Sequence, residues 1–311
     1  MTGLETVATD QKRWALTANK LKIRIQLGRR LILGLAIAGA IFEALAAQIR
    51  GHYPTASEAA GYAGAAALAL VVVVKSQGLG RVRLQAWILA RAAAESFKRE
   101  IYYYRTSSGP YGGNVVGNPD STLFERRDEI LGKVRSIQRF ALEPDPTTVT
   151  VGGPLDADAY ISERVNGQIK WFRNRASEYS LAQGKWETVE YILAAVGALL
   201  GATLTFNGKQ EFGAWVAVVT TISGAVGGQV LAERYDQLAV SFRTSADRLT
   251  GILGRWRAAS SNLSKLVEQV EAALLEENQG WIASADELMR EITSQPVNNS
   301  PRKSTPASSI S

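Results

Sequence analysis

Four long apolar stretches alternate with amphipathic and charged segments along this chain. They form two close pairs, residues 31–49 with 59–74 and residues 189–206 with 212–232. Because a bilayer core about 30 Å thick needs about 20 apolar helical residues, each pair predicts a membrane hairpin. The stretch 59–74 is short, but Lys75 can extend it by reaching toward the membrane interface. The pattern therefore predicts an all-α integral membrane protein with four spans.

The distribution of basic residues predicts the orientation of both hairpins. The turns 50–58 and 207–211 hold few Lys and Arg residues, whereas the segments outside each hairpin hold many. By the positive-inside rule, both termini and the central region lie in the cytoplasm. The alternative is a soluble bundle with buried Ala- and Gly-rich helices. Residues 31–39 and 65–74 oppose it, because they are apolar all round and lack the charged face of a surface helix.

Amphipathic segments flank both hairpins. Residues 10–27 lead into the first hairpin and 81–104 leave it, with glycines at 78 and 80 marking a break. After the second hairpin, an apolar stripe that runs to Leu274 predicts one long exit helix, and such a stripe needs a partner helix. In both halves an amphipathic helix precedes a hairpin and another follows it, so the chain has the plan of two repeated units.

The segment between the units predicts a short helix and a linker. A capping box formed by Thr122 and Glu125 predicts a helix over 122–142, and prolines end it. Asp156 is placed to cap the next helix. We therefore divide the chain into four parts. Residues 10–113 form a first two-helix membrane unit, and residues 114–154 form a cytosolic helix with a linker. Residues 155–293 form a second two-helix membrane unit with a long exit helix, and residues 294–311 form a disordered tail.

Composition narrows the classes of function. The net charge is +6, but the basic residues lie beside apolar runs and not in an aromatic-studded patch, which favours a lipid bilayer over nucleic acid as partner. The absence of cysteine excludes disulfides and thiolate zinc sites. His52 is the one histidine and lies in an outer turn. No catalytic motif is present, so we expect no enzyme, no catalytic residue, no cofactor and no metal.

Polar residues inside the spans are the candidates for function. Glu43 is the sharpest, because an intramembrane carboxylate costs about 2.5–3.5 kcal/mol unless it meets water or a partner. With Gln48 it either lines a pore or makes a buried polar contact; alternatively it reaches the outer interface. Thr220, Thr221 and Ser223 form a stripe that either borders a water path or bonds a neighbouring helix.

Small residues four apart predict close helix packing within or between hairpins. These positions are Gly34 with Ala38, Gly197 with Gly201, and Gly224 with Gly228.

Residues 160–176, with Tyr160, Glu163, Arg164, Trp171 and Phe172 ahead of a hairpin and a long exit helix, resemble the SLATT superfamily of two-transmembrane effector domains. The first half looks like a second unit of this type, in the residues Trp87, Ala90, Arg91, Glu95, Lys98, Glu100, Tyr102, Tyr103, Tyr104, Thr106, Gly109, Pro110 and Tyr111. The resemblance spans roughly residues 10–280.

The resemblance implies an effector of bacterial nucleotide-signalling immunity in the inner (plasma) membrane. Such an effector would form a homo-oligomer and permeabilise the membrane when a separately encoded sensor or nucleotide-producing protein triggers it. Two alternatives remain: a non-conducting membrane-anchored scaffold or signalling adaptor that binds a partner through its cytosolic helices, and a transporter built from two hairpin repeats.

Overall fold

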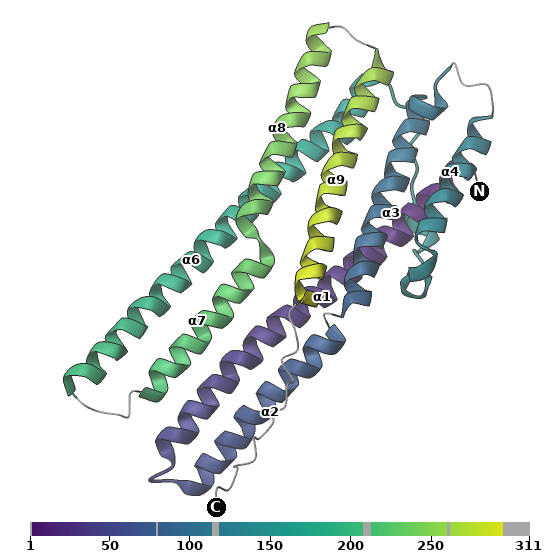
Figure 1. Ribbon diagram of the computed structural model, residues 1–311. Helices are drawn as coiled ribbons and strands as arrows, with labels where there is room; N and C mark the ends of the chain where they lie inside the picture. Colours follow the sequence, from purple (N-terminus) through teal and green to yellow (C-terminus); the bar gives the residue numbers. More distant parts are fainter. Residues whose placement is uncertain (1, 79, 114–117, 208–212, 260–261, 295–311) are drawn as a thin grey trace, which may run out of the picture.

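The computed structural model describes the backbone of residues 2–78, 80–113, 118–207, 213–259 and 262–294. Side chains are also outside the description at 77–78, 146, 204–207, 232 and 281–294. The described part consists of helices and loops (Figure 1), which confirms the predicted all-α class. The principal helices are α1 (Gly3–Ile49), α2 (Pro54–Gly78), α3 (Arg81–Arg105), α4 (Pro119–Lys133), α6 (Gly167–Asn207), α7 (Gly213–Glu233), α8 (Tyr235–Ala259) and α9 (Leu263–Ser294).

The first hairpin consists of the second half of α1 and all of α2. The predicted amphipathic segment 10–27 and the apolar stretch 31–49 belong to one continuous helix, α1. α2 packs closely along it, since the Ser57 hydroxyl donates a 2.7 Å hydrogen bond to the carbonyl of Ala46. Further along the hairpin, a methyl group added at Gly39 would lie 2.9 Å from Cδ2 of Leu68. The hairpin is therefore tightly packed at Gly39, and we call this position the glycine notch.

Three helices in the described part are long and apolar enough to cross a membrane. They are α1, α2 and the stretch Gly213–Ala259, which contains α7 and α8. The third predicted span, residues 189–206, lies in α6, but its last side chains and the turn 208–212 lie outside the described residues. Both hairpins extend toward the same end of the molecule (Figure 1). The chain is a membrane protein.

Two hydrophobic cores lie at the opposite end from the hairpin turns. The first core joins α1, α3 and α4 and includes the fully buried Trp14, Phe97 and Leu123. The second core joins α8 and α9 to the start of α6 and to the short helices before it, α5 (Ala157–Tyr160) and η4 (Ile161–Asn166). Each unit thus attaches its hairpin to a packed helical body.

The segment between the units differs from its prediction at one helix. α4 begins at Pro119, where the Asn118 side chain accepts a 2.9 Å hydrogen bond from the backbone N–H of Asp120. The capping box at Thr122 and the helix bounds 122–142 are therefore wrong, because an Asn cap followed by Pro starts the helix earlier. α4 ends at Lys133, and the 3₁₀ helix η2 (Arg135–Phe140) follows.

The other connections include a capped helix start and two short 3₁₀ helices. The predicted cap at Asp156 is confirmed, since its carboxylate accepts a 2.8 Å hydrogen bond from the backbone N–H of Ala159. The 3₁₀ helices η1 (Gly109–Tyr111) and η3 (Pro146–Thr148) are short. The predicted tail 294–311 lies outside the described residues beyond Ser294.

The predicted single exit helix is two helices. α9 runs back beside α8 (Figure 1), and Leu249 and Leu253 of α8 share the second core with Leu266 and Val270 of α9. The apolar stripe therefore finds its partner within the chain, because folding back lets both apolar faces leave water together. Between α7 and α8, Arg234 has φ +49°, a left-handed conformation that interrupts the helix.

Candidate functional site

Glu43 lies at the surface of the first hairpin. Its side chain is exposed, and a Cβ added at Gly64 of α2 would stand 2.8 Å from its carboxylate oxygen Oε1. The Glu43 carboxylate therefore lies against Gly64, where α1 and α2 pack together. Ile49 ends α1 six residues later, about 9 Å further along at 1.5 Å per residue. Gln48 lies between them and is half-buried.

The hydroxyls of the second hairpin bond within their own helix. Thr220 donates to the carbonyl of Val216 and Thr221 to that of Ala217, each at 2.9 Å, and both side chains are exposed. Ser223 is half-buried. The threonine hydrogen bonds therefore stay within α7 in a single chain, and a role in a pore or between chains stays a prediction.

The small residues predicted to pack helices occupy different environments. A Cβ added at Gly197 of α6 would stand 3.5 Å from Cγ1 of Val219 on α7, an ordinary van der Waals contact. At Gly34, Gly224 and Gly228 no described atom outside the helix backbone lies within 4 Å of such a Cβ. Packing between chains stays a prediction for them, as it does for the half-buried Ala38 and for Gly201.

A buried ion pair lies in the second unit. Arg164 of the π-helix η4 donates through Nε and Nη2 to Oε1 and Oε2 of Glu271 on α9, at 2.9 and 2.8 Å. Their side chains are 2% and 1% exposed. The Tyr160 hydroxyl donates a further bond of 3.1 Å to Glu271. Burial raises the pKa of Tyr160 well above its ordinary value, so its hydroxyl stays a donor at neutral pH.

A second group of polar contacts, next to this ion pair, connects the two units. Arg105 of α3 donates two bonds, of 2.6 and 3.1 Å, to the carboxylate of Glu163, and the Tyr102 hydroxyl donates to it at 3.2 Å. The Arg164 guanidinium lies 4.8 Å from the centre of the Tyr102 ring. Hydrogen bonding to Arg105 lowers the pKa of Glu163, and burial raises the pKa of Tyr102 to about 12. The two units therefore meet through a network of charged and aromatic groups.

This junction network was not predicted, although the sequence holds a signal for it. Arg164 stands beside the apolar position Val165 in η4, and Glu271 stands beside Val270 in the stripe of α9. A charge on an apolar face in each of two helices indicates a buried pair, since an unpaired buried charge is costly. The resemblance singled out Tyr160, Glu163 and Arg164 without giving them a role.

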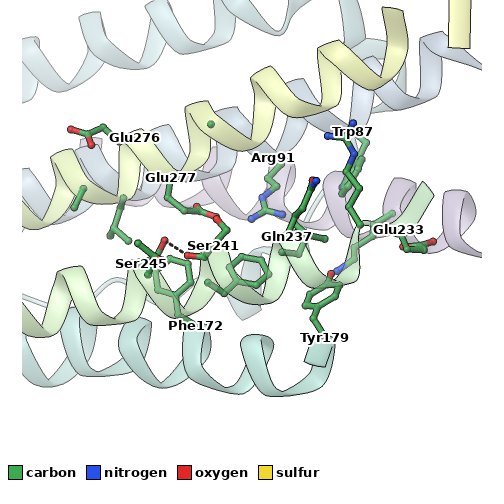
Figure 2. Close-up of a pocket in the computed structure, with 18 of the residues that line it drawn as sticks. Trp87, Arg91, Phe172, Tyr179, Glu233, Gln237, Ser241, Ser245, Glu276 and Glu277 are labelled. Atoms are coloured by element: carbon green, nitrogen blue, oxygen red, sulfur yellow. Dashed lines mark hydrogen bonds between the residues drawn. The ribbon is translucent and has the colours of Figure 1, made fainter. Parts of the chain in front are cut away.

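A cleft follows the junction between the units. One part, of about 590 Å³, lies between α1, α3, α6, α8 and α9, and an adjoining part of about 520 Å³ continues beside η4. Figure 2 shows Arg91 and Glu277 pointing into the larger part, opposite Gln237. Near the membrane end, Arg29 and Glu233 form an ion pair of 2.9 Å between α1 and α7. Within the described residues, no three His, Asp or Glu side chains are grouped to hold a metal.

Comparisons with known proteins assign families to both units. Residues 160–281 match the family described as SMODS and SLOG-associating 2TM effector domain 1. Residues 12–117 match a family described as protein of unknown function (DUF4231). No curated protein and no solved structure matches the chain. The two matches agree with two tandem units and with the resemblance to the SLATT superfamily, and residues 160–281 carry its two-transmembrane effector domain.

Proposed function

We propose that this chain is a membrane effector of a bacterial nucleotide-signalling defence system. It assembles with copies of itself and permeabilises the inner (plasma) membrane when a separately encoded partner triggers it. The match of residues 160–281 to an effector-domain family supports the effector class. Pore formation and triggering are our proposals, and they rest on the surface of the hairpins.

The observation that carries the proposal is the exposed Glu43 in the apolar stretch 31–49 of the first hairpin. A carboxylate at the centre of a span costs about 2.5–3.5 kcal/mol unless water or a partner compensates it, and the cost falls toward the interface. In a single chain the Glu43 side chain is exposed on the hairpin surface. Packing of several copies around a wet centre would remove Glu43 from lipid, so assembly and a water path would meet the same need.

The hairpins also carry exposed apolar surface that is available for assembly. Only 17%, 17% and 11% of the residues in the three apolar windows are buried. α1 and α7 contact each other, which joins the two hairpins. Large apolar side chains remain exposed on α2 and α6, among them Leu70, Val72, Tyr191 and Leu199. These faces can meet either lipid or a second copy.

The arrangement supports a topology with both termini in the cytoplasm. Both hairpins extend toward one end of the molecule, and the helical bodies lie at the other (Figure 1). The basic residues that flank the hairpins lie on the side of the bodies, as the positive-inside rule requires of a cytoplasmic side.

Leakage from dye-loaded liposomes tests the proposal. The full chain is reconstituted at increasing protein-to-lipid ratios, so that mass action drives assembly in the absence of the partner. We expect dye release by the wild type and reduced release by Glu43→Gln, because the variant removes the charge that assembly would shield from lipid. Absence of release at every ratio, with no oligomer found by cross-linking, would favour the non-conducting scaffold.

A further inference from the structure

The smaller part of the cleft, about 520 Å³, is bounded by both units, and we call it the inter-unit chamber. α1 and α3 of the first unit form one side, and η4, α6 and α9 of the second unit form the other. Basic side chains reach it from four of these elements. They are Lys22, Arg91, Lys98, Arg164 and Arg175.

The carboxylates of the chamber balance these cations incompletely. Glu163 is bound by Arg105, which lies outside the chamber lining, and by Tyr102. Two of the cations are paired with carboxylates outside the lining, Arg164 with Glu271 and Arg175 with Glu178. The other lining carboxylates are Glu95 and Glu277. The lining therefore holds five basic and three acidic side chains.

Two buried atoms of the chamber lining lack a hydrogen-bond partner among the described residues. They are Nη1 of Arg164, a donor, and Oδ1 of Asn278, an acceptor. The two residues are 2% and 6% exposed. Native proteins rarely leave buried polar atoms unsatisfied, and a site for a ligand or an ion is one of the ordinary reasons when they do. An anionic oxygen would satisfy Nη1, and a hydroxyl or amine would satisfy Oδ1.

The lysines are held in an unfavourable setting when the chamber is empty of anions. Burial lowers the pKa of Lys98, and the neighbouring charge of Arg164 lowers it further. Burial likewise lowers the pKa of Lys22, with Arg175 and Arg91 as like charges close by. Glu95 and Glu271 raise the pKa of Lys98, and Glu178 and Glu233 raise that of Lys22, but the effect of burial is larger and both pKa values are lowered. A bound anion would relieve both the like-charge repulsion and the loss of solvation.

We propose that the inter-unit chamber binds a phosphate-bearing anion, held by Lys22 and Lys98 with Nη1 of Arg164. A phosphate group fits better than a carboxylate, because its oxygens can accept bonds from several helices at once. The phosphate belongs either to a soluble compound or to a lipid headgroup, since the adjoining part of the cleft reaches Arg29 at the membrane end. The ligand would bridge the two units, whether or not the hairpins conduct.

Thermal unfolding of the full chain in nanodiscs tests this proposal. One arm adds inorganic triphosphate to protein in phosphatidylcholine nanodiscs, and the other replaces part of the phosphatidylcholine with phosphatidylglycerol. The chamber variants are Lys22→Gln and Lys98→Gln. The matched controls are Lys20→Gln, exposed on the same helix as Lys22, and Lys133→Gln, exposed on α4.

We expect one arm to raise the unfolding midpoint of the wild type and of both controls. In each chamber variant the concentration for half the effect rises at least about tenfold, which is the loss of one charge-assisted hydrogen bond. A response to triphosphate identifies a soluble ligand, and a response to phosphatidylglycerol alone identifies a lipid headgroup. No response in either arm, or equal responses by chamber variants and controls, would overturn the proposal.

Discussion

Breaking the buried pair of Arg164 and Glu271 should be among the most damaging polar changes in this protein. Both side chains are at most 2% exposed, and they share two hydrogen bonds of 2.8–2.9 Å. Arg164→Met leaves a buried carboxylate with Tyr160 as its remaining bonded partner, and Glu271→Leu leaves a buried guanidinium without its anion. Removing one partner of a buried pair costs about 3–5 kcal/mol, whereas replacing both with apolar residues is often close to neutral.

A double-mutant cycle therefore gives a clear expectation. Each single variant should lower the unfolding midpoint by roughly 6–20 °C, taking about 2–4 °C per kcal/mol. The double variant Arg164→Met with Glu271→Leu should lose less than either single variant, with a coupling energy of at least about 3 kcal/mol.

The assay is thermal unfolding of the full chain in detergent, followed by helical circular dichroism. The exposed pair of Arg126 and Glu129 in α4, 46% and 59% exposed, provides a matched control. Arg126→Met and Glu129→Leu should each change stability by no more than about 1 kcal/mol. If the costs of Arg164→Met and Glu271→Leu add in the double variant to within about 0.5 kcal/mol, the two groups are not coupled and the reasoning fails.

Three further predictions concern the first hairpin and the cleft. Cysteines at Ala46 and Gly61 should form a disulfide on mild oxidation, since their Cβ atoms would lie 3.9 Å apart in a chain with no other cysteine; free thiols after oxidation would contradict the register. Gly39→Ala should weaken this cross-link, because its methyl group meets α2, while Gly34→Ala should not; equal yields would contradict the notch. Burial raises the pKa of Glu277 above 4.5 in the folded chain, so its contribution to stability is present below about pH 4.5 and lost as pH rises through the folded pKa. Glu277→Gln should therefore flatten the fall of the unfolding midpoint with pH, and an unchanged slope would refute this.

The sequence predicted the elements whose signals are local. α3 was expected over 81–104 and runs over Arg81–Arg105, because glycines precede it and its apolar positions recur at helical spacing. The apolar spans could be recognised because a stretch without a charged face has no stable place at a soluble surface. Asp156 is a short side chain before a helical pattern, and it caps that helix.

Features that depend on tertiary contacts could not be read in the same way. The stripe that joins α8 to α9 looks the same whether the helix continues or folds back, since the periodicity on each side is unchanged. Arg164 of the π-helix η4 can be buried in the core because Glu271 of α9 pairs with its charge, and this pairing depends on a contact far away in the sequence. The spacing of small residues likewise did not identify the glycine at the close helix contact, because that contact in the first hairpin involves Gly39 rather than Gly34.

Cysteine accessibility tests the membrane account most directly, because the chain has no cysteine of its own. His52→Cys places a thiol in the turn between α1 and α2, and Ser121→Cys places one on the exposed side of α4. In intact spheroplasts, a membrane-impermeant maleimide should label His52→Cys and should label Ser121→Cys only after lysis. Labelling of both before lysis, or of neither, would contradict hairpins that cross the membrane with their helical bodies inside.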